Sequence, residues 1–187
     1  MAAEEIAVQD AAPPRLSGRR ERRLVRAAQD GSADALAELY SAHWRRAHRA
    51  AYLVVHDTAA AEDVAQDAFL AAVAALDRFD RRRPFAPWLH RIVVNRALDW
   101  ARREALRRRV DTEQAEPVAS DQPELGDELM AALRELPPEQ RALVVLRHLL
   151  EYTPGEIAAM LELPRGTVNS RLRRALDSLR ETVEVAR

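Results

Sequence analysis

The segment from Arg78 to Arg109 combines the periodicity of an amphipathic helix with eleven arginines and only three acids. Its apolar residues, among them Trp88, Leu89 and Ile92, recur near helical spacing. A local charge of +8 in a chain whose total is −1 repels itself unless a polyanion neutralises it. Such a helix can bind phosphates along one face and offer an aromatic ring to a base. The segment therefore predicts a helix that binds nucleic acid.

Helix signals continue on both sides of this segment, and the chain has only five glycines. Ser32 stands where it can cap a long helix, and Pro84 lies where the basic helix begins. Residues 110–126 lack periodicity and are acidic, and this linker could span about 55 Å if extended. We therefore predict an all-α fold, with two small helical domains joined by an acidic flexible linker. The expected divisions are a disordered N-terminal tail (1–18), a helical bundle (19–109), the linker (110–126) and a C-terminal helix-turn-helix domain (127–187).

A helix-turn-helix is predicted near the C-terminus. The run from Thr153 to Glu156 is a capping box with proline at the first helical position. Glycine is usual in the turn, but this chain has Glu162, so either the turn differs or left-handed strain is tolerated. The second helix of such a motif enters the major groove, where Arg can read guanine and Asn adenine. The alternative is an ordinary helical hairpin with a solvated arginine face. The residues expected on the outward face are Arg165, Thr167, Asn169, Ser170, Arg171, Arg173 and Arg174.

Several classes of function find no support in the composition. The chain has no cysteine, which excludes disulfides, zinc fingers and thiol catalysis. Its five histidines show no ligand spacing, so we expect no metal site and no cofactor. No glycine-rich phosphate loop or nucleophile with a base is visible, which argues against an enzyme. No apolar run approaches the roughly 20 residues of a membrane span, and the N-terminus lacks a signal peptide, so we expect a cytoplasmic protein.

Three blocks of sequence carry a family resemblance. They read AEDVAQDAFLAAVAAL (61–76), FDRRRPFAPWLHRIVVNRALDWARR (79–103) and LRELPPEQRALVVLRHLLEYTPGEIAAMLELPRGTVNSRLRRALDSLR (133–180). Together and in this order they resemble the bacterial RNA polymerase sigma factors of the extracytoplasmic-function group, within the sigma-70-type family. The resemblance implies a factor without chemistry of its own that directs core RNA polymerase to promoters by recognising −10 and −35 elements.

The resemblance also implies roles for particular residues. Trp88 takes the first place of an aromatic pair that acts as a wedge at the edge of melted DNA, and Leu89 takes the second. Simple core packing is the alternative for Trp88. Asp99 is also expected to pair with Arg103 and aim it. The acidic helix is expected to bind the polymerase through Asp63, Gln66 and Asp67, which share one face. The expected −10 contacts are Arg81, Arg82, Arg83, Trp88, Arg91, Asn95, Arg96, Arg102 and Arg103, and the expected −35 contacts are the seven residues of the outward face.

The partners follow from the same resemblance. They are the clamp helices and flap of core RNA polymerase, promoter DNA and an anti-sigma factor. The two promoter elements lie about two helical turns apart, on the order of 70 Å, which suits two tethered units. The main alternative is a stand-alone helix-turn-helix DNA-binding regulator. Such regulators usually dimerise, and since no dimerisation helix is visible we expect a monomer.

Overall fold

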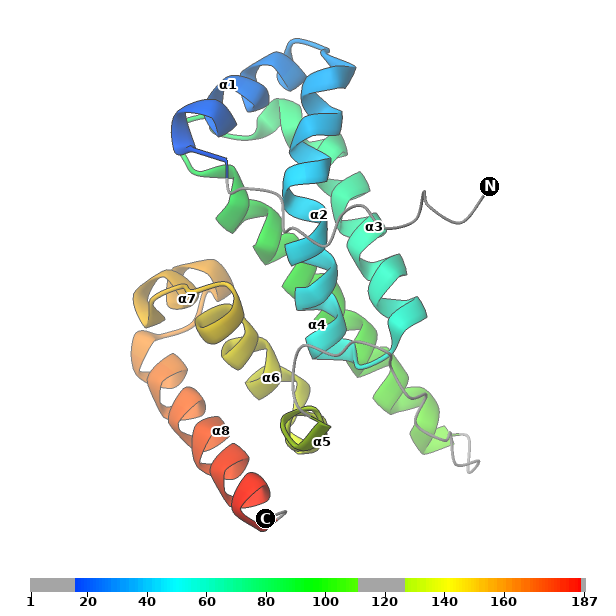
Figure 1. Ribbon diagram of the computed structural model, residues 1–187, viewed down its shortest axis with the longest axis vertical. Helices are drawn as coiled ribbons and strands as arrows, with labels where there is room; N and C mark the ends of the chain where they lie inside the picture. Colours follow the sequence, from blue (N-terminus) through cyan, green and yellow to red (C-terminus); the bar gives the residue numbers. More distant parts are fainter. Residues whose placement is uncertain (1–15, 111–126, 186–187) are drawn as a thin grey trace, which may run out of the picture.

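The computed structural model describes residues 16–110 and 127–185. These residues form helices and connecting turns, with no strand among them (Figure 1). No helix in this described part is long and apolar enough to cross a membrane. The all-α fold predicted from the sequence is confirmed. Most of the expected disordered tail and of the acidic linker, residues 1–15 and 111–126, lies outside the described residues.

The N-terminal unit contains α1 (Gly18–Gln29), α2 (Ala33–Val55), α3 (Thr58–Ala75), the short helix η1 (Leu76–Arg78) and α4 (Phe85–Val110). Ser32 caps α2 as predicted, because its hydroxyl accepts a hydrogen bond from the backbone N–H of Ala35 at 3.2 Å. His56 ends α2 in a left-handed conformation. Asp57 then caps α3 by accepting from the backbone N–H of Ala60 at 2.8 Å.

Alanines line the contacts among the long helices of this unit. α2 packs against α3 and α4 over much of its length (Figure 1). Ala47 and Ala51 on α2, and Ala61 and Ala68 on α3, have no exposed surface. Small side chains at these positions let the helix axes approach closely, since the separation of packed helices is set by the side chains between them.

The C-terminal unit contains α5 (Asp127–Glu135), α6 (Pro138–Val144), the π-helix η2 (Val145–Leu149), α7 (Pro154–Leu161) and α8 (Arg165–Val185). The predicted capping box is present: the backbone N–H of Thr153 donates to Glu156 Oε2 at 2.7 Å, and the backbone N–H of Glu156 donates to Thr153 Oγ1 at 3.3 Å. Glu162 follows α7 with a left-handed φ of 56°. The sequence left two alternatives for this turn, a different turn or left-handed strain at Glu162, and the second is the one observed.

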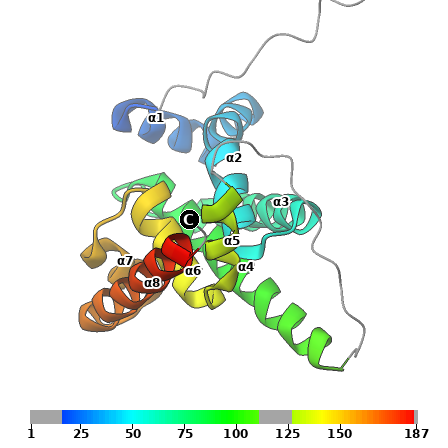
Figure 2. The same ribbon diagram turned by 60° about the horizontal axis from the view of Figure 1, so that its bottom comes forward.

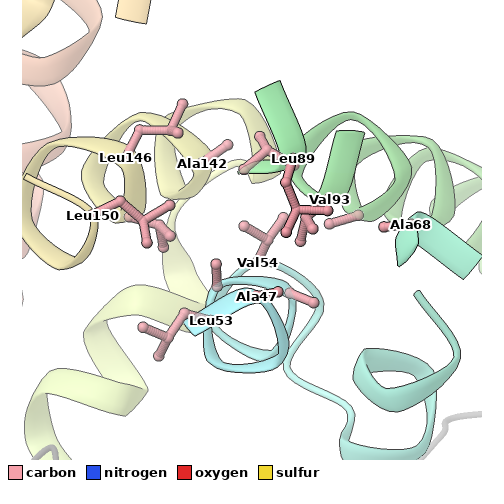
Figure 3. Close-up of a cluster of buried hydrophobic side chains, with 14 of the residues drawn as sticks. Ala47, Leu53, Val54, Ala68, Leu89, Val93, Ala142, Leu146 and Leu150 are labelled. Atoms are coloured by element: carbon pink, nitrogen blue, oxygen red, sulfur yellow. The ribbon is translucent and has the colours of Figure 1, made fainter. Parts of the chain in front are cut away.

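The two units pack against each other, although the sequence predicts only two small domains joined by a flexible linker. α6 and η2 contact α2, and α6 and α7 contact α4 (Figures 1 and 2). Figure 3 shows the resulting cluster, in which Val54 from α2 and Leu89 and Val93 from α4 lie with Ala142 from α6 and Leu146 from η2. All five side chains have no exposed surface. The buried residues of both units thus form one continuous core.

Two histidines lie near this contact, His90 buried and His56 half-buried. Burial is the main cause that lowers the pKa of both His56 and His90 to about 3. The charges of His43 and Arg46 add to the effect at His90, and Arg141 adds to it at His56. Both imidazoles are therefore neutral at physiological pH in the folded chain.

Stability is expected to fall as the pH drops from 7 to 5. Below the unfolded-state pKa of about 6.5, the unfolded chain takes up protons that the folded chain excludes, so the loss can reach about 4 kcal/mol for the two histidines together. Urea unfolding at both pH values measures this difference. Asparagine tolerates the left-handed conformation that His56 adopts, so His56→Asn should keep the fold and remove about half of the pH dependence. His148→Gln, at an exposed position, should retain all of it.

Candidate nucleic-acid interface

The start of the basic helix is held in place by α1. The buried carboxylate of Glu21 accepts a hydrogen bond from the backbone N–H of Phe85, the first residue of α4, at 3.3 Å. The amide of Gln29 donates to the backbone oxygens of Leu76 at 2.7 Å and Phe79 at 3.0 Å. Neither Glu21 nor Gln29 was predicted from the sequence to hold this segment. Their partners lie 47 to 64 residues away, and no local pattern marks them.

Between these two anchors lies the arginine loop, residues 80–83. Asp80 shapes it from within, because its side chain accepts from the backbone N–H of Arg82 at 3.0 Å and its backbone oxygen accepts from that of Arg83 at 2.9 Å. The side chains of Arg81, Arg82 and Arg83 are exposed and form no ion pair with the described residues. The loop therefore presents three fixed cations to solvent at the start of α4.

Trp88 combines core packing with an exposed surface. Its ring centroid lies 4.6 Å from that of Phe79 and 5.5 Å from that of Phe85, and the residue is half-buried. Leu89, which was expected to take the second place of an aromatic wedge, is completely buried in the core. Only Trp88 of this pair is available to a nucleic acid.

Further along α4, Asn95 is exposed and Arg96 is half-buried. A guanidinium nitrogen of Arg96 lies 3.6 Å from Asp67 Oδ2, so a predicted DNA contact touches a predicted polymerase contact. Asp99 was expected to pair with Arg103. Its carboxylate instead lies 3.3 Å from Arg102, and Arg103 donates to the backbone oxygen of Asp99.

The second helix of the helix-turn-helix is anchored by Val168, Leu172 and Ala175, all buried. Of the seven residues predicted on its outward face, four are exposed and three are half-buried. The hydroxyl of Ser170 donates to the backbone oxygen of Thr167 at 3.1 Å. The exposed ones are Arg165, Asn169, Arg173 and Arg174, and the half-buried ones are Thr167, Ser170 and Arg171.

A separate surface lies on α3. The three predicted polymerase contacts, Asp63, Gln66 and Asp67, are exposed there. Gln66 borders an apolar groove of about 520 Å³ between α2 and α3. Leu70 and Val73, which are 67% and 43% exposed, line the same groove. This α2/α3 groove was missed in the sequence, since apolar residues on a helix are read as core unless the packing is known.

Both helical units match families of known proteins. Residues 39–107 match the model of sigma-70 region 2, and residues 126–179 match that of sigma-70 region 4. The chain is also 38% identical over 163 residues to the ECF RNA polymerase sigma factor SigM of Mycobacterium tuberculosis, covering 84% of this chain and 83% of SigM. This chain belongs to the extracytoplasmic-function group of the sigma-70 family.

Other relatives extend the likeness. The sigma factor is 32% identical over 170 residues to the RNA polymerase sigma factor CarQ of Myxococcus xanthus, covering 85% of this chain and 98% of CarQ. Among solved structures it is similar to CnrH in complex with the cytosolic domain of CnrY, with a TM-score of 0.67, 28% identity and coverage of 89% of this chain and 98% of CnrH. The region 2 match begins within α2, so α1 of this sigma factor, with Glu21 and Gln29, lies outside the matched residues.

The described residues of the sigma factor hold no group of three or more histidines or acids that could bind a metal ion. Its candidate surfaces are instead cationic and aromatic on α4, cationic on α8, and acidic and apolar on α3. These are the properties of surfaces that bind DNA and protein.

Proposed function

We propose that this sigma factor binds DNA through two surfaces and core RNA polymerase through a third. The arginine loop and α4 read and open the −10 element, α8 reads the −35 element, and α3 binds core RNA polymerase. As an alternative sigma factor, the chain directs promoter-specific transcription initiation. The observation that carries this conclusion is the presence of region 2 and region 4 in one chain, each with its own arginine-rich helix.

Charge and aromatic surface support the assignment of the −10 element to α4. Strand separation exposes bases and phosphates, and a protein can bind them by stacking rings on bases and pairing cations with phosphates. The half-buried ring of Trp88 rests on Phe79 and Phe85 and keeps a surface for one base. The arginine loop lies at the same end of α4. A base extruded from the stack costs a few kcal/mol, which these contacts can offset.

Geometry supports the assignment of the −35 element to α8. Exposed Arg165 and Asn169 lie in its first turns, the part of a recognition helix that reaches base edges in the major groove. Arg173 and Arg174 follow on the exposed side and suit phosphates. The buried residues Val168 and Leu172 fix the helix beneath them.

The polymerase surface on α3 joins an acidic edge to the α2/α3 groove. Exposed apolar area of this kind is typical of protein interfaces. Burying a leucine side chain contributes about 1.5–3 kcal/mol, so one residue in the groove can change the affinity by roughly 10- to 100-fold.

Leu70→Asp is therefore expected to weaken binding to core RNA polymerase by roughly 10- to 100-fold. Leu70 is 67% exposed, so the substitution leaves the fold intact. Leu106→Asp is a matched control, because Leu106 is 64% exposed and lies on α4, away from the groove. Titration of labelled sigma factor with core enzyme measures both affinities. Equal affinities for the two variants would remove the groove from the interface.

The remaining partners and location are part of the proposal. CnrH, to which the chain is similar, was solved with the cytosolic domain of CnrY, and we propose that an anti-sigma factor binds this chain too. We place the sigma factor in the cytoplasm, where the polymerase acts. Bond formation belongs to the polymerase, so the chain itself is not an enzyme.

Run-off transcription with core polymerase on a genomic library tests the function. Defined start sites that need the added chain are expected. A gel shift on the promoters so found separates the alternatives. A sigma factor should bind them specifically only with core polymerase, whereas a stand-alone regulator should bind them alone. Specific binding by the free chain together with an absence of new start sites would refute the proposal.

A further inference from the structure

We propose that α1 takes part in opening the promoter, because two of its side chains fix the residues that support Trp88. Gln29 and Glu21 are these side chains, and they act as positioning residues. The inference rests on the proposed function, in which Trp88 and the arginine loop act on the −10 element. It extends that function to a helix outside the residues matched to region 2.

α1 holds the arginine loop at both ends. The amide of Gln29 donates to the backbone oxygen of Phe79, directly before the loop, at 3.0 Å. The carboxylate of Glu21 accepts from the backbone N–H of Phe85, shortly after the loop, at 3.3 Å. Figure 1 shows α1 at the end of the N-terminal unit where α4 begins. The loop therefore connects two backbone positions that one helix fixes in space.

The two residues held in this way carry the rings on which Trp88 rests. The ring centroid of Trp88 lies 4.6 Å from that of Phe79 and 5.5 Å from that of Phe85. The centroids of the two phenylalanines lie 5.8 Å apart. Both phenylalanines are buried, whereas Trp88 is half-buried. Because stacking depends on the offset and tilt of the rings, a shift of either backbone would misplace the ring that has to stack on a base.

The hydrogen bonds of Gln29 indicate a role beyond stability. Its amide also donates to the backbone oxygen of Leu76 at 2.7 Å, so both of its N–H groups hold the segment before the loop. Its Oε1 is buried and accepts no hydrogen bond from the described residues. A buried acceptor without a partner destabilises a fold, and such a group in a native protein calls for an explanation. The two bonds that position Phe79 supply one.

The influence of α1 is confined to the arginine loop and the start of α4. Further along the helix, Arg91 pairs with Glu162, and a guanidinium nitrogen of Arg96 lies 3.6 Å from Asp67 Oδ2. These predicted −10 contacts are held by residues outside α1. Loss of the α1 contacts should therefore slow strand opening more than it weakens the initial binding of duplex promoter.

Substitution of Gln29 tests the inference more cleanly than that of Glu21, which also contacts buried His43. Gln29→Met keeps the length of the side chain but removes both donors, whereas Gln29→Lys keeps N–H donors and has no acceptor. With core polymerase on a promoter found by the run-off experiment, Gln29→Met should slow opening roughly tenfold, measured by permanganate reactivity of thymines in the −10 element. Gln29→Lys should recover most of the rate. Gln140→Met makes the same change at a half-buried position on α6 and should open at the wild-type rate.

A double substitution shows whether Gln29 acts through Trp88. Trp88→Leu keeps an apolar side chain against Phe79 and Phe85 but removes the ring that stacks, so by itself it should slow opening. In this background Gln29→Met should slow opening further by about twofold at most, because changes along one line of contacts are not additive. Thermal unfolding of every variant sets the temperature of the opening assay below the lowest Tm, so that all the proteins compared are folded.

Opening by Gln29→Met at the wild-type rate would overturn the inference. So would a lysine variant slower than the methionine variant, which would indicate packing rather than donation. An equal effect of Gln29→Met with and without Trp88 would also overturn it. Failure of the proposed function looks different. In that case Trp88→Leu by itself leaves opening unchanged, or the wild-type chain directs no new start sites.

Discussion

Replacing Arg81, Arg82 and Arg83 together with glutamine is expected to weaken binding of the polymerase complex to its promoter on the order of 10²-fold at physiological salt. The three side chains are exposed, and none is paired with another described residue, so their charge is available to phosphates. The backbone of the loop is held by Asp80 and by Gln29 from α1, so the substitution removes charge without unfolding the loop.

The salt dependence distinguishes this effect from a change in fold. Each phosphate contact contributes about 0.7 to 0.9 to the slope of log K against log salt. The triple substitution should therefore make the slope less steep by about two to three. A control with Arg23, Arg134 and Arg180 replaced by glutamine changes the same charge at exposed positions on α1, α5 and α8. If this control flattens the slope equally, the loop has no special role.

Glu21→Ala is expected to destabilise the fold by about 3 kcal/mol, lowering Tm by about 6–12 °C. Glu21 is buried, and its two carboxylate oxygens serve different partners. One accepts from the backbone N–H of Phe85 at 3.3 Å, and the other lies 3.1 Å from Nε2 of buried His43. Truncation leaves the buried N–H of Phe85 without an acceptor, which costs about 1–3 kcal/mol, and it also removes the carboxylate beside the His43 ring.

Glu21→Gln keeps the shape and one acceptor oxygen, so it should recover a large part of the lost stability. Thermal unfolding of the three proteins gives the comparison. Because Glu21 holds the start of α4, the alanine variant should also open promoters poorly at temperatures where it remains folded. Glu38→Ala, at a half-buried position on α2, serves as a control. A Glu21→Ala variant as stable as this control would show that the cap contributes nothing.

The helices themselves could be predicted because their signals are local. A cap such as Ser32 binds an N–H three residues away, and the capping box from Thr153 to Glu156 spans a single turn. The concentration of arginine before and along α4 is likewise visible in the residues alone. These features identified both helical units and the family before any contact was known.

The pairing of side chains could be predicted less well. Asp99 has arginines at both i+3 and i+4, and spacing alone allows either partner. The α2/α3 groove shows the same limit. Leu70 and Val73 look like core residues in the sequence, and only the packing of α2 against α3 shows that they are exposed.

The sequence by itself determined the all-α class, the starts of three helices at Ser32, Pro84 and Thr153, and the charge of each segment, because these depend on residues within one or two turns of each other. Only the tertiary structure decided what lies across space. It placed Glu21 beneath the start of α4, 64 residues further along the chain, and Tyr152 against His90, 62 residues away. It also buried Leu89 completely. Such contacts depend on how whole helices pack, and no period along the chain encodes them.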